Sequence, residues 1–251
     1  MLKPDKAAAP SIGIVLTCYK RPHLLTDQLQ AIRRQSVPAS EVVIWDNGSR
    51  ADIASWPLHD NESVVRCSKN WGVWPRFLFA ACLKTEYVAV FDDDTMPGHD
   101  WLSNCLDTIE GLPTFSLLGA VGVLFPDGTR ANRGYVGWKN PMNEAVHADI
   151  VGHAWFCRRE LLDWFVIDHD AGPTFGEDYT LSARARELGG VVACPPHPPN
   201  DLAKWGSLRG LELGSDEHAL YRQPAEECKK TAVHEALRKR GWKVVTEVYG
   251  G

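Results

Sequence analysis

Short apolar runs alternate with amphipathic segments along most of the chain. These runs are partly β-branched and end in turn-forming residues, which is typical of buried strands. Between the first two runs, Pro22 suits the first turn of a helix, and an apolar stripe at helical spacing follows it. A strand, a helix and a strand joined this closely predict a right-handed parallel βαβ unit. The strands predicted in the first half of the chain are 11–16, 41–45, 63–67 and 87–91.

The same alternation continues through the second half of the chain. A turn at 126–129 separates two apolar runs, which predicts a hairpin. Arg158 ends a strand where a further helix begins. The other predicted elements are helices at 75–83, 100–109, 179–188 and 226–240, strands at 117–125, 134–138, 149–157 and 191–194, and an edge strand at 243–249.

Strands that alternate with helices predict an α/β fold. We expect a Rossmann-like, mostly parallel central sheet flanked by helices, a smaller mixed region in the second half and a C-terminal helical appendage. The predicted organisation is a loose tail over 1–10, one domain over 11–200 with halves 11–110 and 111–200, and an extension over 201–251 packed on the same domain.

The composition is that of a globular protein, with 44% hydrophobic and 24% charged residues among 251. The net charge of -5 argues against nucleic acid as a partner. No apolar run approaches the about 20 residues of a membrane span, and residues 1–11 lack the apolar core of a signal peptide. Seven cysteines without a Cys-x-x-Cys pair indicate reduced thiols. We expect a cytoplasmic protein, and peripheral association with the cytoplasmic face of a membrane stays open.

Three carboxylates, Asp92, Asp93 and Asp94, follow the apolar run 87–91, and Pro97-Gly98 prevents the strand from continuing. Like charges packed this closely are costly unless a cation lies among them. Carboxylate oxygens suit Mg²⁺ or Mn²⁺, which commonly share their coordination shell with substrate phosphates. The triple therefore predicts a metal and phosphate site, and a solvated acidic turn is the plain alternative.

Polar clusters also follow the first two predicted strands, at 17–21 and 46–49, and the pair Glu177-Asp178 opens a later helix. Because the carboxyl ends of parallel strands lie along one edge of a sheet, we expect the strand-end clusters to share one crevice with the acidic triple.

The ordered set of these motifs, together with Asn70-Trp71-Gly72, resembles the GT-A-fold glycosyltransferases of family 2 over roughly residues 11–200. The resemblance implies an inverting transfer of a sugar from a nucleotide-diphosphate sugar to a hydroxyl of a glycan or lipid-linked acceptor. It assigns 11–110 to nucleotide binding and 111–200 to acceptor binding. A UDP-sugar is the favoured donor, with GDP- or dTDP-sugars as alternatives.

The resemblance also implies roles for single residues. Asp178 is the expected catalytic base, with Glu177 as the second choice. The expected metal ligands for Mn²⁺ or Mg²⁺ are Asp94, Asp92 and His197. The expected nucleotide-sugar contacts are Thr17, Tyr19, Arg21, Asp46, Asn70, Arg76, Asp92 and Asp93.

Plainer interpretations stand beside these roles. Asp46 could only initiate its own turn, Glu177 and Asp178 could be ordinary acids at a helix start, and His197 could be an exposed loop histidine. His153 and Trp155 could shape the acceptor pocket or simply pack in the core. After the Asn-x-Gly turn the family commonly has small residues and an Arg-Asn pair, and this chain has Trp71, Trp74 and Arg76 instead. Among these we expect Arg76 to contact the diphosphate.

The chemistry requires a cation near the departing diphosphate, a carboxylate that takes the acceptor proton, and walls that hold the reactants in line. A single base and no second candidate nucleophile favour inversion. A nucleotidyltransferase is the enzyme alternative, although residues 17–22 lack the glycine-rich loop that holds a triphosphate. A non-catalytic sugar-binding domain is the other alternative.

Overall fold

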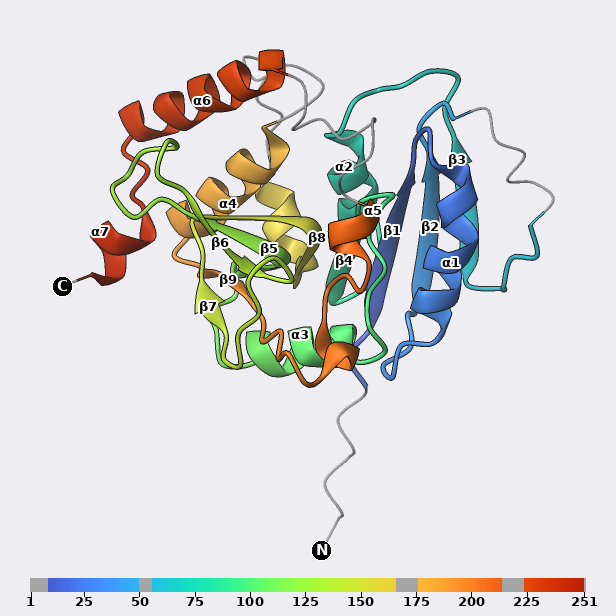
Figure 1. The fold of residues 1–251 in the computed structure, drawn as a ribbon. Coiled ribbons are helices and arrows are strands. Elements are labelled where there is room, and N and C mark those ends of the chain that lie inside the picture. The colour runs from blue at the N-terminus through green and yellow to red at the C-terminus, as the bar shows by residue number, and fades with distance from the viewer. Residues whose placement is uncertain (1–8, 50–55, 166–175, 214–223, 251) are drawn as a thin grey trace, which may run out of the picture.

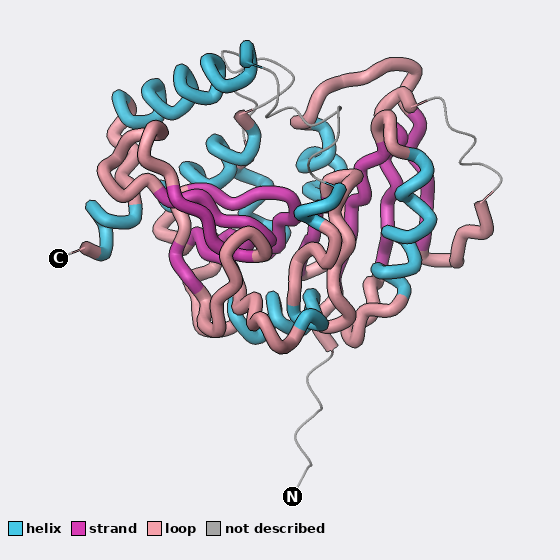
Figure 2. The backbone as a smooth tube through the Cα atoms, viewed as in Figure 1, coloured by secondary structure: helices cyan, strands magenta, loops and turns pink. Residues whose placement is uncertain are grey.

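The computed structural model describes residues 9–49, 56–165, 176–213 and 224–250. Within them, nine strands form one sheet in the order β3-β2-β1-β4-β8-β5-β9-β7, with β6 paired to β5. Figure 1 shows helices on both sides of this sheet. Figure 2 shows the strands as a twisted band across the molecule, with the strands of its two halves running in different directions in the view. The predicted α/β architecture with a helix-flanked central sheet is confirmed.

The first half of the sheet is parallel. It consists of β1 (Ile12–Cys18), β2 (Glu41–Asp46), β3 (Glu62–Arg66) and β4 (Tyr87–Phe91), and α1 (Pro22–Arg33) connects the first two strands. The register pairs Cys18 with Asp46 and Leu16 with Phe91. The strand ends that carry the polar clusters therefore lie side by side at one edge, as the sequence predicts.

The second half of the sheet is mixed. It contains β5 (Leu117–Leu124), β6 (Gly134–Gly137), β7 (Val146–His147), β8 (Ile150–Arg158) and β9 (Val192–Cys194). The predicted hairpin between the two runs around 126–129 is present as the antiparallel pair β5 and β6. Strand β8 runs antiparallel to both β4 and β5 and so carries its central residues to the carboxyl end of β4.

The strands bury alternate side chains against opposite helical layers, as their two-residue period requires. Val15 and Val43 pack in one core with α2 (Pro75–Ala81) and α4 (Glu177–Glu187). Ile14, Leu16 and Ile44 pack in the other core with α1 and with α3 (Trp101–Ile109). The remaining helices are the short 3₁₀ helices η2 (Arg159–Trp164) and η4 (Leu202–Lys204), together with α5 (Gly210–Leu213), α6 (Pro224–Lys239) and α7 (Val245–Tyr249).

The edge strand expected at 243–249 is wrong, because this segment forms the helix α7. Gly241 turns the chain with a φ of 93°, a left-handed conformation that favours glycine. Asp149 then accepts a hydrogen bond from the N–H of Val245 at 2.6 Å and so fixes the start of α7. The edge next to β9 is taken by β7, so residues 243–249 do not pair with it.

Described residues near the C-terminal end pack on the same core as α4 and the strands of the sheet. Val233, Leu237, Trp242 and Val244 all belong to the core layer that contains α4. The segment around η4 runs alongside the chain that follows β4, where Leu208 N donates to Met96 O at 2.7 Å. Among the described residues, no helix combines the length and the apolar character that crossing a membrane requires. All seven cysteines are unpaired, and four of them, Cys18, Cys105, Cys157 and Cys194, are buried.

Candidate active site

The acidic triple forms a turn that other elements hold in place. Gln28 of α1 donates hydrogen bonds from Nε2 to the carbonyl oxygens of Asp92 at 2.7 Å and Thr95 at 2.9 Å. On the opposite side, Asp92 N and Thr95 Oγ1 both donate to the carbonyl oxygen of His153 on β8, at 3.0 and 2.8 Å. The turn is thereby fixed between a helix and the antiparallel strand, which sets the directions of its carboxylates.

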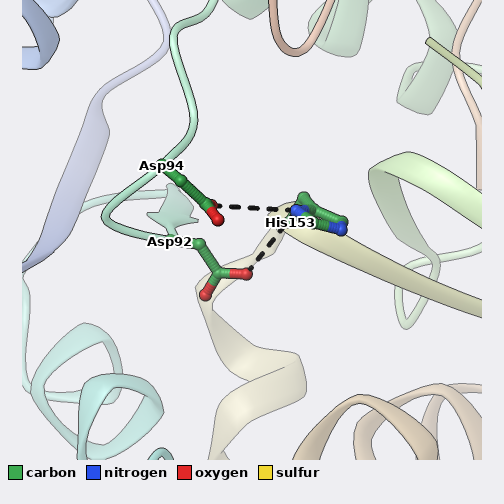
Figure 3. A group of neighbouring side chains, drawn as sticks. All are labelled: Asp92, Asp94 and His153. Carbon is green, nitrogen blue, oxygen red and sulfur yellow. Dashed lines mark ion pairs between the residues drawn. The ribbon is translucent and has the colours of Figure 1, made fainter. Parts of the chain in front are cut away.

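Asp92, Asp94 and His153 place three ligand-type atoms within 4.8 Å of one another (Figure 3). The Nδ1 atom of His153 lies 4.0 Å from Oδ2 of Asp92 and 3.8 Å from Oδ1 of Asp94. His153 has a φ of 66°, an uncommon left-handed conformation for a residue other than glycine. Sequence reasoning placed Asp92 and Asp94 in a metal site but gave His153 only a pocket or core role.

The donor set of this cluster fits a divalent cation. Oδ1 of Asp94 is buried and has no hydrogen-bond partner among the described residues, so a ligand-competent oxygen is left unused. Burial alone would raise the pKa of Asp94, but the neighbouring His153 ring and the Arg21 charge hold this pKa below its ordinary value. Two carboxylate oxygens and an imidazole nitrogen are ligands that Mn²⁺ accepts.

Asp93 pairs closely with Arg21, whose Nη1 also lies 3.7 Å from Oδ2 of Asp94. Oδ1 of Asp93 pairs with Nη1 of Arg21 at 2.5 Å, and Oδ2 of Asp93 accepts a hydrogen bond from the N–H of Tyr19 at 3.3 Å. Burial raises the pKa of Asp93 to about 7, and the charge of Arg21 opposes this increase. Three predicted site residues, Tyr19, Arg21 and Asp93, are therefore in direct contact where β1 ends.

Arg76 connects the acidic triple to the start of α4. One terminal nitrogen pairs with Asp92, and the other pairs with Oε1 of Glu177 at 2.5 Å. The guanidinium carbon lies 4.5 Å from the ring centroid of Trp155, within the range of a cation–π contact. Burial alone would lower the pKa of Arg76, but the charges of Asp92 and Glu177 outweigh this effect and raise it. Arg76 is thus a charged link between two predicted functional groups.

Glu177 and Asp178 open α4 after Gly176, whose φ of 92° is readily adopted only by glycine. Burial raises the pKa of Glu177 to about 7, against the charge of Arg76. Burial also raises the pKa of Asp178, against the charge of Lys230 on α6. Oδ1 of Asp178 accepts the N–H of Tyr179 at 2.8 Å, and the residue is half-buried. Of the two acids, Glu177 is the one whose carboxylate is ion-paired with Arg76.

The nucleotide-side residues lie where β1 and β2 end. Asp46 is 4% exposed, and its Oδ1 accepts the N–H of Ser49 at 2.9 Å, which is the turn contact that the plain interpretation expects. Oγ1 of the buried Thr17 has no hydrogen-bond partner among the described residues. Both side chains therefore lie at the carboxyl ends of neighbouring parallel strands, and Thr17 retains unused hydrogen-bonding capacity.

Asn47 organises the turn that carries Asn70, a role that sequence reasoning missed. Its Nδ2 donates to Asn70 Oδ1 and to Gly72 O, each at 2.9 Å, and its Oδ1 accepts the N–H of Trp71 at 2.8 Å. The Asp-Asn-Gly-Ser sequence indicated a turn, but the partner of the Asn side chain lies on a separate segment. The structure thus joins the predicted clusters at 46–49 and 70–72.

His197 does not join the cluster of Asp92, Asp94 and His153. Its side chain is fully buried, Nδ1 lies 2.8 Å from Pro195 O, and Nε2 accepts the N–H of Gly206 at 3.0 Å. Burial lowers the pKa of His197 to about 4, so the ring is neutral. Both ring nitrogens are occupied by backbone groups, and the exposed loop position considered as its alternative role is not observed either.

The sequence profile of glycosyl transferase family 2 matches residues 13–163. A search of curated proteins finds no match. Among solved structures, S. aureus TarS 1–349 has a TM-score of 0.54 at 16% identity and covers 73% of this chain and 57% of that one. The same TarS fragment with UDP-GlcNAc gives 0.52 at 17% identity, with 73% and 55% covered. GalNAc-T7 with UDP, GalNAc and Mn²⁺ gives 0.59 at 13% identity, with 91% and 55% covered.

The chain spans a little over half the length of these solved structures, and at such low identities the likeness shows the fold alone. That fold is the GT-A fold expected from the motifs. The family profile spans more than half of this chain and includes the strand-end clusters, Arg76, the acidic triple and His153. The chain therefore belongs to glycosyl transferase family 2.

Proposed function

We propose that this protein transfers a sugar from a nucleotide-diphosphate sugar to a hydroxyl group of a glycan or lipid-linked acceptor, with inversion at the anomeric carbon. The single observation that carries the proposal is the joining of two sites by Arg76. This residue pairs with Asp92 of the acidic cluster and with Glu177, the neighbour of the candidate base Asp178. Family membership already disfavours a nucleotidyltransferase and a non-catalytic sugar-binding domain.

Asp92, Asp94 and His153 are the residues proposed to hold a divalent cation, Mn²⁺ or Mg²⁺. Their ligand-type atoms lie close together, and the buried Asp94 Oδ1 has no other partner among the described residues. When bound, such a cation offsets the negative charge of a departing diphosphate. GalNAc-T7, a structural neighbour, has been solved with Mn²⁺. His197 is not retained in this proposal, because backbone groups occupy both of its nitrogens.

The nucleotide and its sugar are proposed to lie along the carboxyl ends of β1, β2 and β4, between the polar clusters. A parallel sheet binds ligands at this edge. Unused hydrogen-bonding capacity at Thr17 supports the assignment. The nearby contacts of Tyr19 and Arg21 with Asp93, and of Asn70 with Asn47, hold the remaining predicted residues around the same edge. Two structural neighbours were solved with UDP-GlcNAc and with UDP, which supports a UDP-sugar as the donor over GDP- or dTDP-sugars.

Asp178 is the proposed base that accepts the proton of the attacking hydroxyl. Asp178 as a residue is half-buried and has, among the described residues, no ion-pair partner as close as Arg76 is to Glu177, which is 7% exposed. A raised pKa suits a base, because it brings the proton affinity of the carboxylate closer to that needed near neutral pH. Glu177 acts as the ionic anchor of the α4 start, and Arg76 holds it in place. A single displacement with one base inverts the anomeric centre.

Isothermal titration calorimetry tests the donor and the metal together. Wild-type protein is titrated with UDP-, GDP- and dTDP-sugars, once in the presence of Mn²⁺ and once in the presence of EDTA. Hydrolysis of the best donor is then measured as the amount of nucleotide released. We expect Asp94→Ala to lose metal-dependent nucleotide binding and Asp178→Ala to keep binding but lose turnover. Normal turnover by Asp178→Ala would show that another group is the base, and donor binding unaffected by EDTA would exclude the metal role.

We propose that residues 11–110 bind the nucleotide, that 111–200 bind the acceptor, and that the protein acts in the cytoplasm or on the cytoplasmic face of a membrane. The described packing supports one body, because residues from 233 to 244 share a core with α4. Fractionation of cells that express the chain, with and without a high-salt wash, tests its location.

A further inference from the structure

A cavity of about 590 Å³ lies between the β5–β6 connection and α6. Gly128 to Arg133 form one wall, and α6 forms the other with side chains from Glu227 to Lys239. In Figure 1 this is the region where the green connection meets the red helix α6. None of the residues predicted for nucleotide, metal or base lines this cavity.

Arg130 lines the cavity and is 8% exposed. Its two terminal nitrogens pair with the Tyr179 hydroxyl and with Oε1 of Glu227, the latter at 2.6 Å. Its third nitrogen, Nε, is buried and has no hydrogen-bond partner among the described residues. A buried donor left unpaired costs about 1–3 kcal/mol, so a ligand that accepts from Nε would remove this penalty.

His234 lines the same cavity and has the same kind of unused capacity. Its Nε2 lies 2.9 Å from Gly128 O, so Nε2 carries the proton and Nδ1 is the acceptor. Nδ1 is buried and without a partner among the described residues. Burial lowers the pKa of His234, which keeps the ring neutral. Two residues that line the cavity thus carry buried polar atoms without a partner among the described residues, a donor on Arg130 and an acceptor on His234.

Cationic side chains outnumber carboxylates around the cavity. Glu227 is shared by Arg130 and by Arg133, which is 3.1 Å from the same oxygen, so one carboxylate faces two guanidiniums. Glu247, outside the cavity, pairs with Arg238 at 2.5 Å. The lining cations are Arg130, Arg133, Arg238 and Lys239, and the lining carboxylates are Glu227 and Glu235. Even when Glu247 is counted as a third carboxylate, four cations leave an excess of one positive charge.

Two contacts connect elements that line the cavity to the start of α4, which carries the candidate base. Tyr179, whose hydroxyl accepts from Arg130, follows Asp178 directly in α4 and donates its N–H to the Asp178 carboxylate. Lys230 of α6 lies near enough for its charge to act on Asp178. A ligand held between the β5–β6 connection and α6 would therefore contact Arg130, which is bonded to Tyr179, the residue after Asp178.

We propose that this cavity anchors an anionic group, a phosphate or a carboxylate, of the acceptor saccharide. The inference rests on the proposed glycosyl transfer and adds the charge class of the acceptor. Arg130 Nε and Arg133 bind the anion, and His234 Nδ1 accepts a hydroxyl of the adjoining sugar. The guanidinium geometry suits planar carboxylates and phosphates better than a lysine would.

Inorganic phosphate is the probe for the anion site. Full-length protein labelled with ¹⁵N-arginine is titrated with phosphate in the presence of EDTA, and the Nε–H signals of Arg130 and Arg76 are followed. Arg130→Lys identifies the Arg130 signal, and Arg76 is the internal reference in the metal site. We expect a saturable shift of the Arg130 signal, with affinity about fivefold or more weaker in Arg133→Gln. Lys243→Gln, which removes an exposed charge that does not line the cavity, is the matched control and should keep the affinity within twofold.

The absence of a saturable shift at Arg130, or an equal loss of affinity in Lys243→Gln, would overturn the anion site. Transfer is then compared for neutral, phosphorylated and uronic acid saccharides with the donor identified above. We expect anionic acceptors to be preferred, and Arg133→Gln to reduce this preference while donor hydrolysis without acceptor stays unchanged. Equal use of neutral and anionic acceptors would overturn the acceptor role. If the wild-type protein neither hydrolysed a nucleotide-sugar donor nor transferred its sugar, the proposed function itself would be contradicted.

Discussion

Arg76→Met is the substitution that most directly tests the link between the acidic cluster and α4. Methionine keeps much of the aliphatic volume beside Phe77 and Trp155 but removes the charge shared by Asp92 and Glu177. Arg76 is 4% exposed and the Glu177 side chain 9%, so the lost pair is buried on that side. The Asp92 side chain is 27% exposed, so water partly compensates there.

Breaking a buried ion pair by removing one partner costs about 3–5 kcal/mol, because the other charge stays buried without compensation. The partial exposure of Asp92 leads us to expect the lower end, about 3 kcal/mol at pH 8. The pKa of Glu177 is already raised to about 7 by burial, and loss of the opposing Arg76 charge raises it further. A carboxyl whose folded pKa exceeds its unfolded value loses stability as pH rises through the folded pKa. The deficit of the variant should therefore be nearly constant below about pH 6 and grow as the pH rises through 7 to 8, where Glu177 ionises in folded wild type but is held protonated in the variant.

Urea denaturation at pH 5, 6, 7 and 8 measures the free energy of unfolding of wild type, Arg76→Met and Arg76→Lys. Arg76→Lys keeps the charge but lacks the fork that reaches two carboxylates, so it should fall between the other two proteins. The double variant with Glu177→Gln should recover part of the loss at pH 8. A deficit under about 1 kcal/mol, or one independent of pH, would refute the reasoning, because the carboxylates would then be adequately solvated without Arg76.

Three further predictions concern single contacts. His153→Ala should weaken the affinity for Mn²⁺ in calorimetry about tenfold or more, because it removes a proposed ligand. His197→Ala should leave this affinity within about twofold and lower Tm, and the opposite pattern would make His197 the ligand. Asn47→Ala should release residues 70–72 and raise KM for the donor more than it lowers kcat, and an unchanged KM would show that this turn does not contact the donor. Asp149→Asn should cost about 2–3 kcal/mol in urea denaturation, because Asp149 is 1% exposed and accepts from Phe125 N and Val245 N; a loss under about 0.5 kcal/mol would contradict this.

The strands and most helices were predictable because their signals are local. The run 87–91 and the stripe after Pro22 each decide their own conformation, and the structure confirms β4 and α1 at those places. The strand-end positions of Asp46 and Asp92 followed from parallel order alone, because such ends meet at one edge. The error at 243–249 arose where an apolar pattern too short to distinguish a strand from a helix was decided by the buried Asp149, far away in the sequence.

Local residue patterns were enough to predict the α/β class, the family and the acids at the sheet edge. Which groups contact these acids became visible only in the folded chain. His153 reaches Asp94 because β8 runs antiparallel to β4, Arg76 reaches Glu177 across about a hundred positions, and backbone groups occupy His197. Residue spacing within one element fixes which side chains share its face, whereas contacts between elements depend on pairing direction and packing, which no local pattern of residues encodes.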